Sequence, residues 1–172
     1  MTTSVRYRVE RLTGDIDAAP AEFRARYEQA VPPLPEERMA DLVRRHAPWA
    51  EMLAVVEEAA PFGFLIYNKI DADPLLRLAG DEAFCTSYLM GNHTIAERMF
   101  RYEPAVLLYA PLHTVIWGDP DGPAHFTFDK PSDQFGSFGN PAVTAVGTEL
   151  DGKVAALLRH LGAEVPAALL GS

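Results

Sequence analysis

Apolar and polar residues follow two periods along the chain, and segments of each period alternate. Segments with a period of two, or rich in β-branched and aromatic residues, predict strands. They lie at 5–10, 62–70, 84–90, 104–109 and 112–129, the last being a hairpin. Segments with apolar residues three and four positions apart predict amphipathic helices. They lie at 20–31, 36–46, 48–60, 93–102 and 141–161. This order predicts an α+β fold, with a mainly antiparallel sheet and helices packed on it.

The helix starts and ends carry local signals. The helix at 141–161 has the clearest apolar stripe, made of Val143, Val146, Leu150, Val154, Leu157 and Leu161. A short helical turn is expected at 73–80, with proline and glycine where helix ends favour them. The start of 93–102 has two alternatives, because Asn92 is a good N-cap whereas Thr94 and Glu97 have the spacing of a capping box.

These elements predict a single domain over residues 1–162, since 172 residues suit one core. Its parts are a strand and helix at 4–31, a helical insert at about 32–60 and the main α+β part at about 62–160. Residues 131–141 are rich in Gly, Ser and Phe and predict a flexible loop. The tail at 163–172 is expected to be loose.

The hairpin at 112–129 is the most strongly signalled element, because a turn sequence at 119–122 separates two apolar runs. If this turn sets the register, Val115 pairs with Phe126 and Trp117 pairs with Ala124. The core face then consists of Val115, Trp117, Ala124, Phe126 and Phe128, with His113 near its end. The opposite, mixed face consists of Leu112, Thr114, Ile116, His125, Thr127 and Asp129, and it suits either solvent or a polar-lined pocket.

Composition and charge exclude several classes of function. The chain has 15 Lys and Arg against 24 Asp and Glu, a net charge of −9, which argues against a nucleic-acid partner. One cysteine permits neither an internal disulfide nor a Cys-x-x-Cys zinc pair. The first ten residues have no apolar run typical of a signal peptide, and no apolar stretch of about 18 residues could span a membrane. We therefore expect a cytoplasmic protein with no membrane partner.

His93 is the first candidate for chemistry, because it stands where a helix begins. A helix N-terminus lowers the pKa of an imidazole and keeps it neutral, which suits a hydrogen-bond donor or a general base. Glu97 lies one turn further on and could orient the ring. The simpler interpretation is a polar first-turn residue followed by a capping acid. A metal would need further ligands from His125 and Asp129, and we expect none.

Other candidates come from the strands and the loop. Tyr67 and Lys69 share one face of a strand, which is either solvated or the wall of an anion-binding cleft. Cys85 is most simply a small core residue, because a nucleophile would want a nearby histidine and a positive setting. The glycines near Phe135 and Phe138 do not form a dinucleotide fingerprint, and this loop suits a flap with two aromatic residues that closes over a ligand.

The order of short motifs along the chain resembles the domain-of-unknown-function 302 family. The motifs are Val5-Arg6-Tyr7-Arg8-Val9-Glu10-Arg11, Gly63-Phe64-Leu65-Ile66, Gly91-Asn92-x-x-x-Ala96, Pro104-Ala105-Val106, Leu108 to Pro111, Asp121-Gly122 and Gly139-Asn140-Pro141. The resemblance implies a small, cytoplasmic, bacterial protein with a TATA-binding-protein-like α+β fold, often dimeric, and it implies no reaction. The chain departs from the family pattern at His93, where a proline is usual, and in a longer segment at 32–61.

These observations predict a homodimer that binds a small acidic or apolar metabolite in a cleft beside the central helix. The expected binding residues are Tyr67, Lys69, Asn92, His93, His125, Thr127, Phe135 and Phe138. The alternative is a small enzyme of isomerase, lyase or hydrolase type, with His93 as acid or base and Glu97 or Asp129 assisting. A third interpretation is a structural or interaction module. No cofactor and no metal are expected.

Overall fold

The computed structural model describes residues 2–171 and contains one five-stranded sheet. Every pair of neighbouring strands is antiparallel, in the order β1-β5-β4-β3-β2. The strands are β1 (Arg11–Ile16), β2 (Leu65–Asp71), β3 (Phe84–Gly91), β4 (Leu112–Gly118) and β5 (Ala124–Asp129). The predicted α+β fold with an antiparallel sheet is confirmed.

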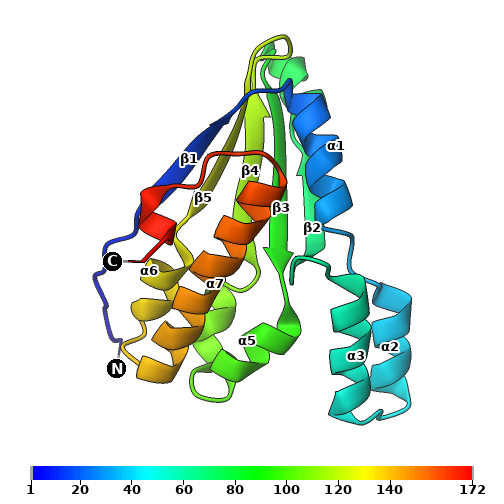
Figure 1. The fold of residues 1–172 in the computed structure, drawn as a ribbon, viewed down its shortest axis with the longest axis vertical. Coiled ribbons are helices and arrows are strands. Elements are labelled where there is room, and N and C mark those ends of the chain that lie inside the picture. Colours follow the sequence, from blue (N-terminus) through cyan, green and yellow to red (C-terminus); the bar gives the residue numbers. More distant parts are fainter. Residues whose placement is uncertain (1, 172) are drawn as a thin grey trace.

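The helices cover one face of this sheet. The principal ones are α1 (Pro20–Ala30), α5 (His93–Phe100), α6 (Pro131–Gly136) and α7 (Pro141–His160). Helices α1 and α7 cross the same face, and α5 and α6 pack against α7 at its lower end (Figure 1). A helical hairpin of α2 (Glu36–Arg44) and α3 (Trp49–Ala59) projects beside the β2 edge (Figure 1). The short elements are α4 (Asp73–Leu76) and the 3₁₀ turns η1 (Arg77–Ala79), η2 (Pro104–Leu108) and η3 (Ala167–Leu169).

The main core lies between the sheet and the helices. The predicted stripe of α7 is buried there, and α1 contributes Phe23 and Tyr27 against Phe126 of β5. A second, smaller cluster joins the α2–α3 hairpin to the body and consists of Met39, Val56, Ala60 and Leu65. Backbone hydrogen bonds from Leu34 to Ile66 and from Ile66 to Pro32 fasten the start of the hairpin to β2. Burial of apolar surface in both clusters drives this packing.

The predicted register of the β4–β5 hairpin is wrong by one residue. Trp117 pairs with His125 and Val115 pairs with Thr127. Proline has no N–H for the ladder. Pro123 therefore stays in the loop, and Ala124 is the first residue of β5. The buried face of β4 consequently consists of Leu112, Thr114 and Ile116, whereas Trp117 lies on the outer face and is 40% exposed.

Two predicted strands do not form. Residues 5–10 precede the sheet, because β5 ends at Asp129, the partner of Arg11. One more backbone hydrogen bond joins Lys130 to Glu10, and the chain then enters α6 at Pro131. Residues 104–109 begin with the 3₁₀ turn η2, in which Pro104 takes the first position and Glu103 accepts a hydrogen bond from Ala105 N–H.

Two segments expected to be loose are packed. The loop at 131–141 contains α6, whose Ser132 N–H donates to buried Asp151 of α7 at 2.9 Å, and Phe135 is fully buried. Burial raises the pKa of the Asp151 carboxyl above its usual value. The tail contains η3, where Leu169 is buried in the main core. Tertiary contacts thus order both segments.

Candidate functional site

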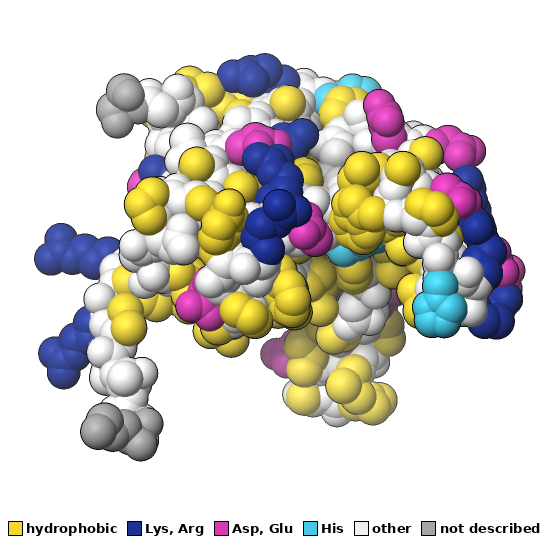
Figure 2. All heavy atoms as spheres, turned by 90° about the horizontal axis from the view of Figure 1, so that it is seen from below, with side chains coloured by type: hydrophobic (Ala, Val, Ile, Leu, Met, Phe, Trp, Pro, Cys, Tyr) yellow, Lys and Arg dark blue, Asp and Glu magenta, His cyan; other side chains and the backbone are white. Residues whose placement is uncertain are grey.

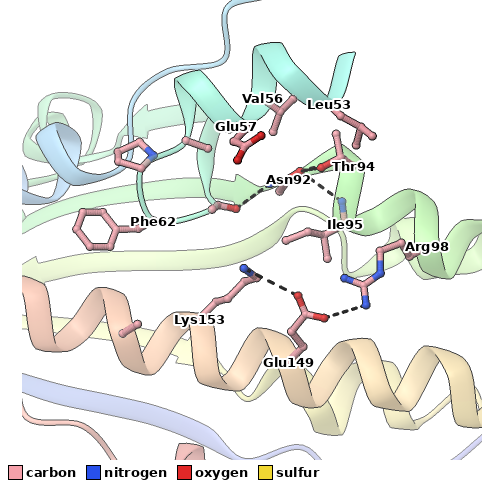
Figure 3. Close-up of a pocket in the computed structure, with 14 residues that line it drawn as sticks. Leu53, Val56, Glu57, Phe62, Asn92, Thr94, Ile95, Arg98, Glu149 and Lys153 are labelled. Carbon is pink, nitrogen blue, oxygen red and sulfur yellow. Dashed lines mark hydrogen bonds and ion pairs between the residues drawn. The ribbon is translucent and has the colours of Figure 1, made fainter. Parts of the chain in front are cut away.

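A groove of ≈ 780 Å³ with an apolar wall runs beside the central helix α5. It is bounded by α3, the turn at 60–63, the first turn of α5 and α7 (Figure 3). Its apolar lining includes Leu53, Val56, Phe62 and Ile95. Pockets for metabolite-sized ligands typically occupy about 300–1,000 Å³, so this groove has a suitable size.

Charged side chains stand on both sides of the groove. Glu149 of α7 accepts from Arg98 of α5 at 2.8 Å and lies 3.9 Å from Lys153, one helical turn away. The hydrogen bond from Arg98 holds the pKa of Glu149 below its usual value. Within residues 2–171 Lys153 has no anionic partner closer than 3.9 Å. Its ammonium points toward the groove from below, while Glu57 points in from α3 above (Figure 3).

Asn92 fixes the first turn of α5. Its Oδ1 accepts from Thr94 N–H at 2.9 Å and Ile95 N–H at 3.3 Å, so Asn92 is the N-cap. The capping-box alternative does not form, because Glu97 pairs instead with Arg101 at 2.6 Å. These backbone donors are already engaged, so the start of α5 offers an anion fewer free N–H groups than the sequence suggests.

Tyr67 and His93 form a hydrogen-bonded pair at the same end of α5. The Tyr67 hydroxyl lies 2.6 Å from Nδ1 of His93 and 2.8 Å from the His93 backbone nitrogen, which donates to it. An irregularity in β2 between Ile66 and Asn68 places Tyr67. Burial lowers the pKa of His93 and raises the pKa of Tyr67 to about 12, so both side chains are neutral near pH 7.

A pocket of ≈ 100 Å³ adjoins this pair. Its polar lining is Tyr67, Asn92 and His93, and its apolar lining is Ala96, Leu107, Ala110 and Pro111. Nε2 of His93 is buried and has no hydrogen-bond partner among residues 2–171. The structure thus brings together three of the residues that the sequence predicts for a site.

Lys69 lies apart from both hollows. Its ammonium contacts Glu28 of α1 at 2.9 Å and Asp71 at 3.4 Å. The Tyr88 hydroxyl donates to the same Glu28 carboxylate at 2.7 Å. Burial opposes ionisation of Glu28, but hydrogen bonds from Lys69 and Tyr88 hold its pKa below the usual value. Lys69 therefore ties α1 to the sheet and is not placed to bind a ligand at His93.

The three polar candidates of β5 lie on the outer face of the sheet, away from α5. His125 Nδ1 is 2.8 Å from Asp15, Thr127 accepts from Trp117 Nε1 at 2.9 Å, and Asp129 pairs with Arg11 at 3.3 Å. Cys85 shares this outer face and is half-buried rather than in the core. Burial raises the pKa of its thiol, which disfavours a thiolate.

Because Asp129 lies on the outer face of the sheet, away from α5, it is not placed to assist His93.

The two aromatic residues of the predicted flap lie elsewhere. Phe135 is in the main core, and Phe138 packs against Tyr109, with ring centroids 5.8 Å apart. Neither residue lines the groove or the smaller pocket. The correction follows from α6, which turns Phe135 toward α7 and leaves no free loop to close over a ligand.

Sequence reasoning missed the charged residues of the groove. Arg98, Glu149 and Lys153 occupy the polar faces of α5 and α7, where charged residues usually meet solvent. The only signal was the four-residue spacing of Glu149 and Lys153. Within the described chain, no three His, Cys, Asp or Glu side chains are grouped to hold a metal ion. None of the helices in residues 2–171 has the length and apolar character needed to cross a bilayer.

Comparisons with known proteins agree on the fold. A family model described as "Domain of unknown function DUF302" matches residues 43–161. A crystal structure of an uncharacterized conserved protein DUF302 from Bacillus stearothermophilus superposes with a TM-score of 0.62 at 16% sequence identity. The match covers 88% of this chain and 97% of that chain. No curated protein matches this sequence.

Proposed function

The chain belongs to the DUF302 family, and from this premise we propose that it binds a small acidic molecule with an apolar body in the groove beside α5. The family's description assigns no activity, so the proposal rests on the groove itself. The observation that supports it is an apolar wall together with Lys153, whose ammonium is only weakly paired with Glu149, in a hollow of metabolite size.

The charges of the groove favour an anionic group at one end of the ligand. Glu149 lies 2.8 Å from Arg98 but 3.9 Å from Lys153, so Arg98 has a close ion-pair partner and Lys153 does not. A carboxylate placed near Lys153 gains a charge-assisted hydrogen bond. The same ligand would rest its hydrocarbon part on Val56 and Ile95 and avoid Glu57 on the opposite wall.

Binding of hexanoate and of its neutral counterpart hexanamide tests this proposal. Isothermal titration should show tighter binding of hexanoate, and Lys153→Gln should weaken hexanoate binding by about tenfold, the loss expected for one charged hydrogen bond. Arg159→Gln removes a charge from the same helix outside the groove and serves as the matched control. Equal binding of acid and amide, or equal effects of the two variants, contradicts the proposal.

An acid–base enzyme is the second candidate, and the Tyr67–His93 pair is the observation that favours it. The imidazole is neutral and hydrogen-bonded to a second titratable group, as in many catalytic pairs. Glu97 is engaged by Arg101, and Asp129 lies on the outer face of the sheet. These placements leave His93 without the assisting carboxylate that the enzyme hypothesis needs, so we favour binding.

We also propose that the chain forms a homodimer through the outer face of its sheet. Helices α1 and α7 cover the inner face (Figure 1). Trp117 lies on the outer face and is exposed. The charges of this face are paired within one copy, Asp15 with His125 and Arg11 with Asp129. The Arg11–Asp129 pair carries no net charge, so this part of the face adds little to the repulsion between two copies of a chain with a net charge of −9.

A further inference from the structure

The hydrogen bonds of Tyr67 determine which ring nitrogen of His93 carries the proton. A hydroxyl has one proton and two lone pairs, and one lone pair accepts from the His93 backbone N–H at 2.8 Å. The 2.6 Å contact with Nδ1 then has two possible directions. If the hydroxyl donates, the proton of the neutral ring is on Nε2, and Nε2–H is the one group left unpaired.

The opposite direction of the hydrogen bond between Tyr67 and His93, with Nδ1 as the donor, is less favourable. If Nδ1 donated to the Tyr67 oxygen, the hydroxyl proton would have no acceptor among residues 2–171, and the lone pair of Nε2 would also remain unpaired. Burying two unsatisfied polar groups is worse than burying one. The geometry therefore favours the tautomer with the proton on Nε2, in which His93 presents a hydrogen-bond donor and not a base.

The pocket beside His93 determines what this donor can meet. Its volume of ≈ 100 Å³ equals about three water molecules at ~30 Å³ each, enough for a molecule or terminal group of a few heavy atoms. Its apolar lining residues are Ala96, Leu107, Ala110 and Pro111, and no charged side chain of residues 2–171 lines it. A carboxylate entering it would lose its hydration without gaining a counter-ion. A neutral acceptor is the better match.

We propose that this pocket binds a neutral carbonyl group, whose oxygen accepts a hydrogen bond from Nε2–H of His93. The site is separate from the groove that contains Lys153, although Asn92 lines both. A neutral imidazole N–H at the start of a helix is well suited to bind and polarise a carbonyl oxygen. His93 is thereby assigned as the recognition residue of a second site, with Tyr67 as the residue that sets its tautomer.

Leu107 lies at the rim of this pocket. Its side chain is 53% exposed and lines the pocket, and the adjacent Leu108 is 74% exposed and does not. Both leucines belong to η2, and Phe100 and Tyr102 are also exposed. Seen from below, the molecule shows several exposed hydrophobic side chains (Figure 2). Nε2 itself has almost no accessible surface, so a ligand contacts it only if the lining of the pocket moves, and Leu107 is the exposed residue of that lining. Leu107 and Leu108 therefore offer a matched pair of variants.

Nitrogen NMR of the labelled full chain, titrated with acetamide and with acetate, tests the proposal. Long-range proton–nitrogen spectra at pH 7 should show His93 protonated on Nε2. Acetamide should shift the Nε2 resonance saturably, and acetate should bind at least about tenfold more weakly because no cation lines the pocket. Leu107→Ala should change the affinity for acetamide severalfold, whereas Leu108→Ala and Lys153→Gln should leave it unchanged.

Three results would overturn the proposal. The first is a proton on Nδ1, which reverses the hydrogen bond with Tyr67. The second is a persistent water signal at Nε2–H that acetamide does not displace, which assigns the pocket to a structural water. The third is equal binding of acetate and acetamide. All three are measured on the wild-type chain, so they do not depend on whether a His93 variant folds.

Discussion

The side chain of Asn92 joins two segments of the groove, because its Nδ2 donates to the carbonyl oxygen of Gly63 at 3.0 Å while its Oδ1 caps α5. Gly63 belongs to the turn between α3 and β2 and has a positive φ of 76°, a conformation that favours glycine. One amide therefore holds the first turn of the central helix against the end of the helical hairpin.

The two roles of Asn92 can be separated by substitution. Asn92→Ala removes both and should lower the free energy of unfolding by about 0.5–2 kcal/mol, the range for loss of an N-cap. Asn92→Asp keeps the accepting oxygen but removes the donor to Gly63, and it should retain most of the stability. Urea unfolding measures both. Equal losses for the two variants would show that the Gly63 contact, and not the cap, dominates.

The observed register predicts opposite effects for two aromatic residues of the hairpin. Phe126→Ala empties a fully buried position and should lower the free energy of unfolding by about 3–5 kcal/mol. Trp117→Ala should lower it by about 1 kcal/mol or less, because a partly exposed side chain gains less from burial. Thermal or urea unfolding of the two variants compares them directly. A larger loss for Trp117 would indicate that the monomer packs in the register expected from the turn.

The lowered pKa of His93 predicts a pH dependence of stability. An unfolded histidine titrates near pH 6.5, and the folded one titrates at a lower pH. Between these two pKa values the unfolded state binds more protons, so stability falls as the pH drops below about 6.5 and levels off below the folded pKa. His93→Gln cannot titrate and should show a smaller decline over that interval. Parallel unfolding curves for both proteins from pH 7 to pH 5 would contradict the burial of the ring.

The contact of Lys69 with Glu28 predicts a structural and not a binding role. Lys69→Met removes the partner of Glu28 and should lower the free energy of unfolding by about 1 kcal/mol or less, since the pair is partly solvated. Binding of hexanoate, measured by titration, should not change. A loss of binding with unchanged stability would restore Lys69 to the site.

A homodimer through the outer face of the sheet predicts a distinct response to two added charges. Trp117→Lys places a cation on that face and should shift the chain toward monomer in sedimentation equilibrium. Leu108→Lys places the same charge on the apolar surface near η2 and should leave the dimer intact. A monomeric wild-type chain, or dissociation by Leu108→Lys alone, contradicts the proposed interface.

Local signals in the sequence predicted the longer helices, because each signal depends on residues a few positions apart, but they missed α6. The apolar spacing of α7 and the cap at Asn92 both hold in the structure. Strand pairing depends on distant partners, and it was less predictable. Residues 5–10 alternate as a strand does, yet β5 ends at Asp129, and only Glu10 makes a backbone hydrogen bond beyond it, with Lys130. Pro123 stays outside β5, and the register of β4 differs by one residue from the expected one, which exchanges the faces of β4.

The sequence by itself determined the α+β class, the positions of the longer helices and the family resemblance, since periodicity and motif order are properties of neighbouring residues. Only the tertiary structure decided which polar residues meet. Tyr67 reaches His93 because β2 and the start of α5 come together, and Lys153 faces the groove because α7 packs beside α5. His125 and Asp129 lie on the other side of the sheet. Contacts between distant elements depend on how layers pack, and no local pattern encodes that geometry.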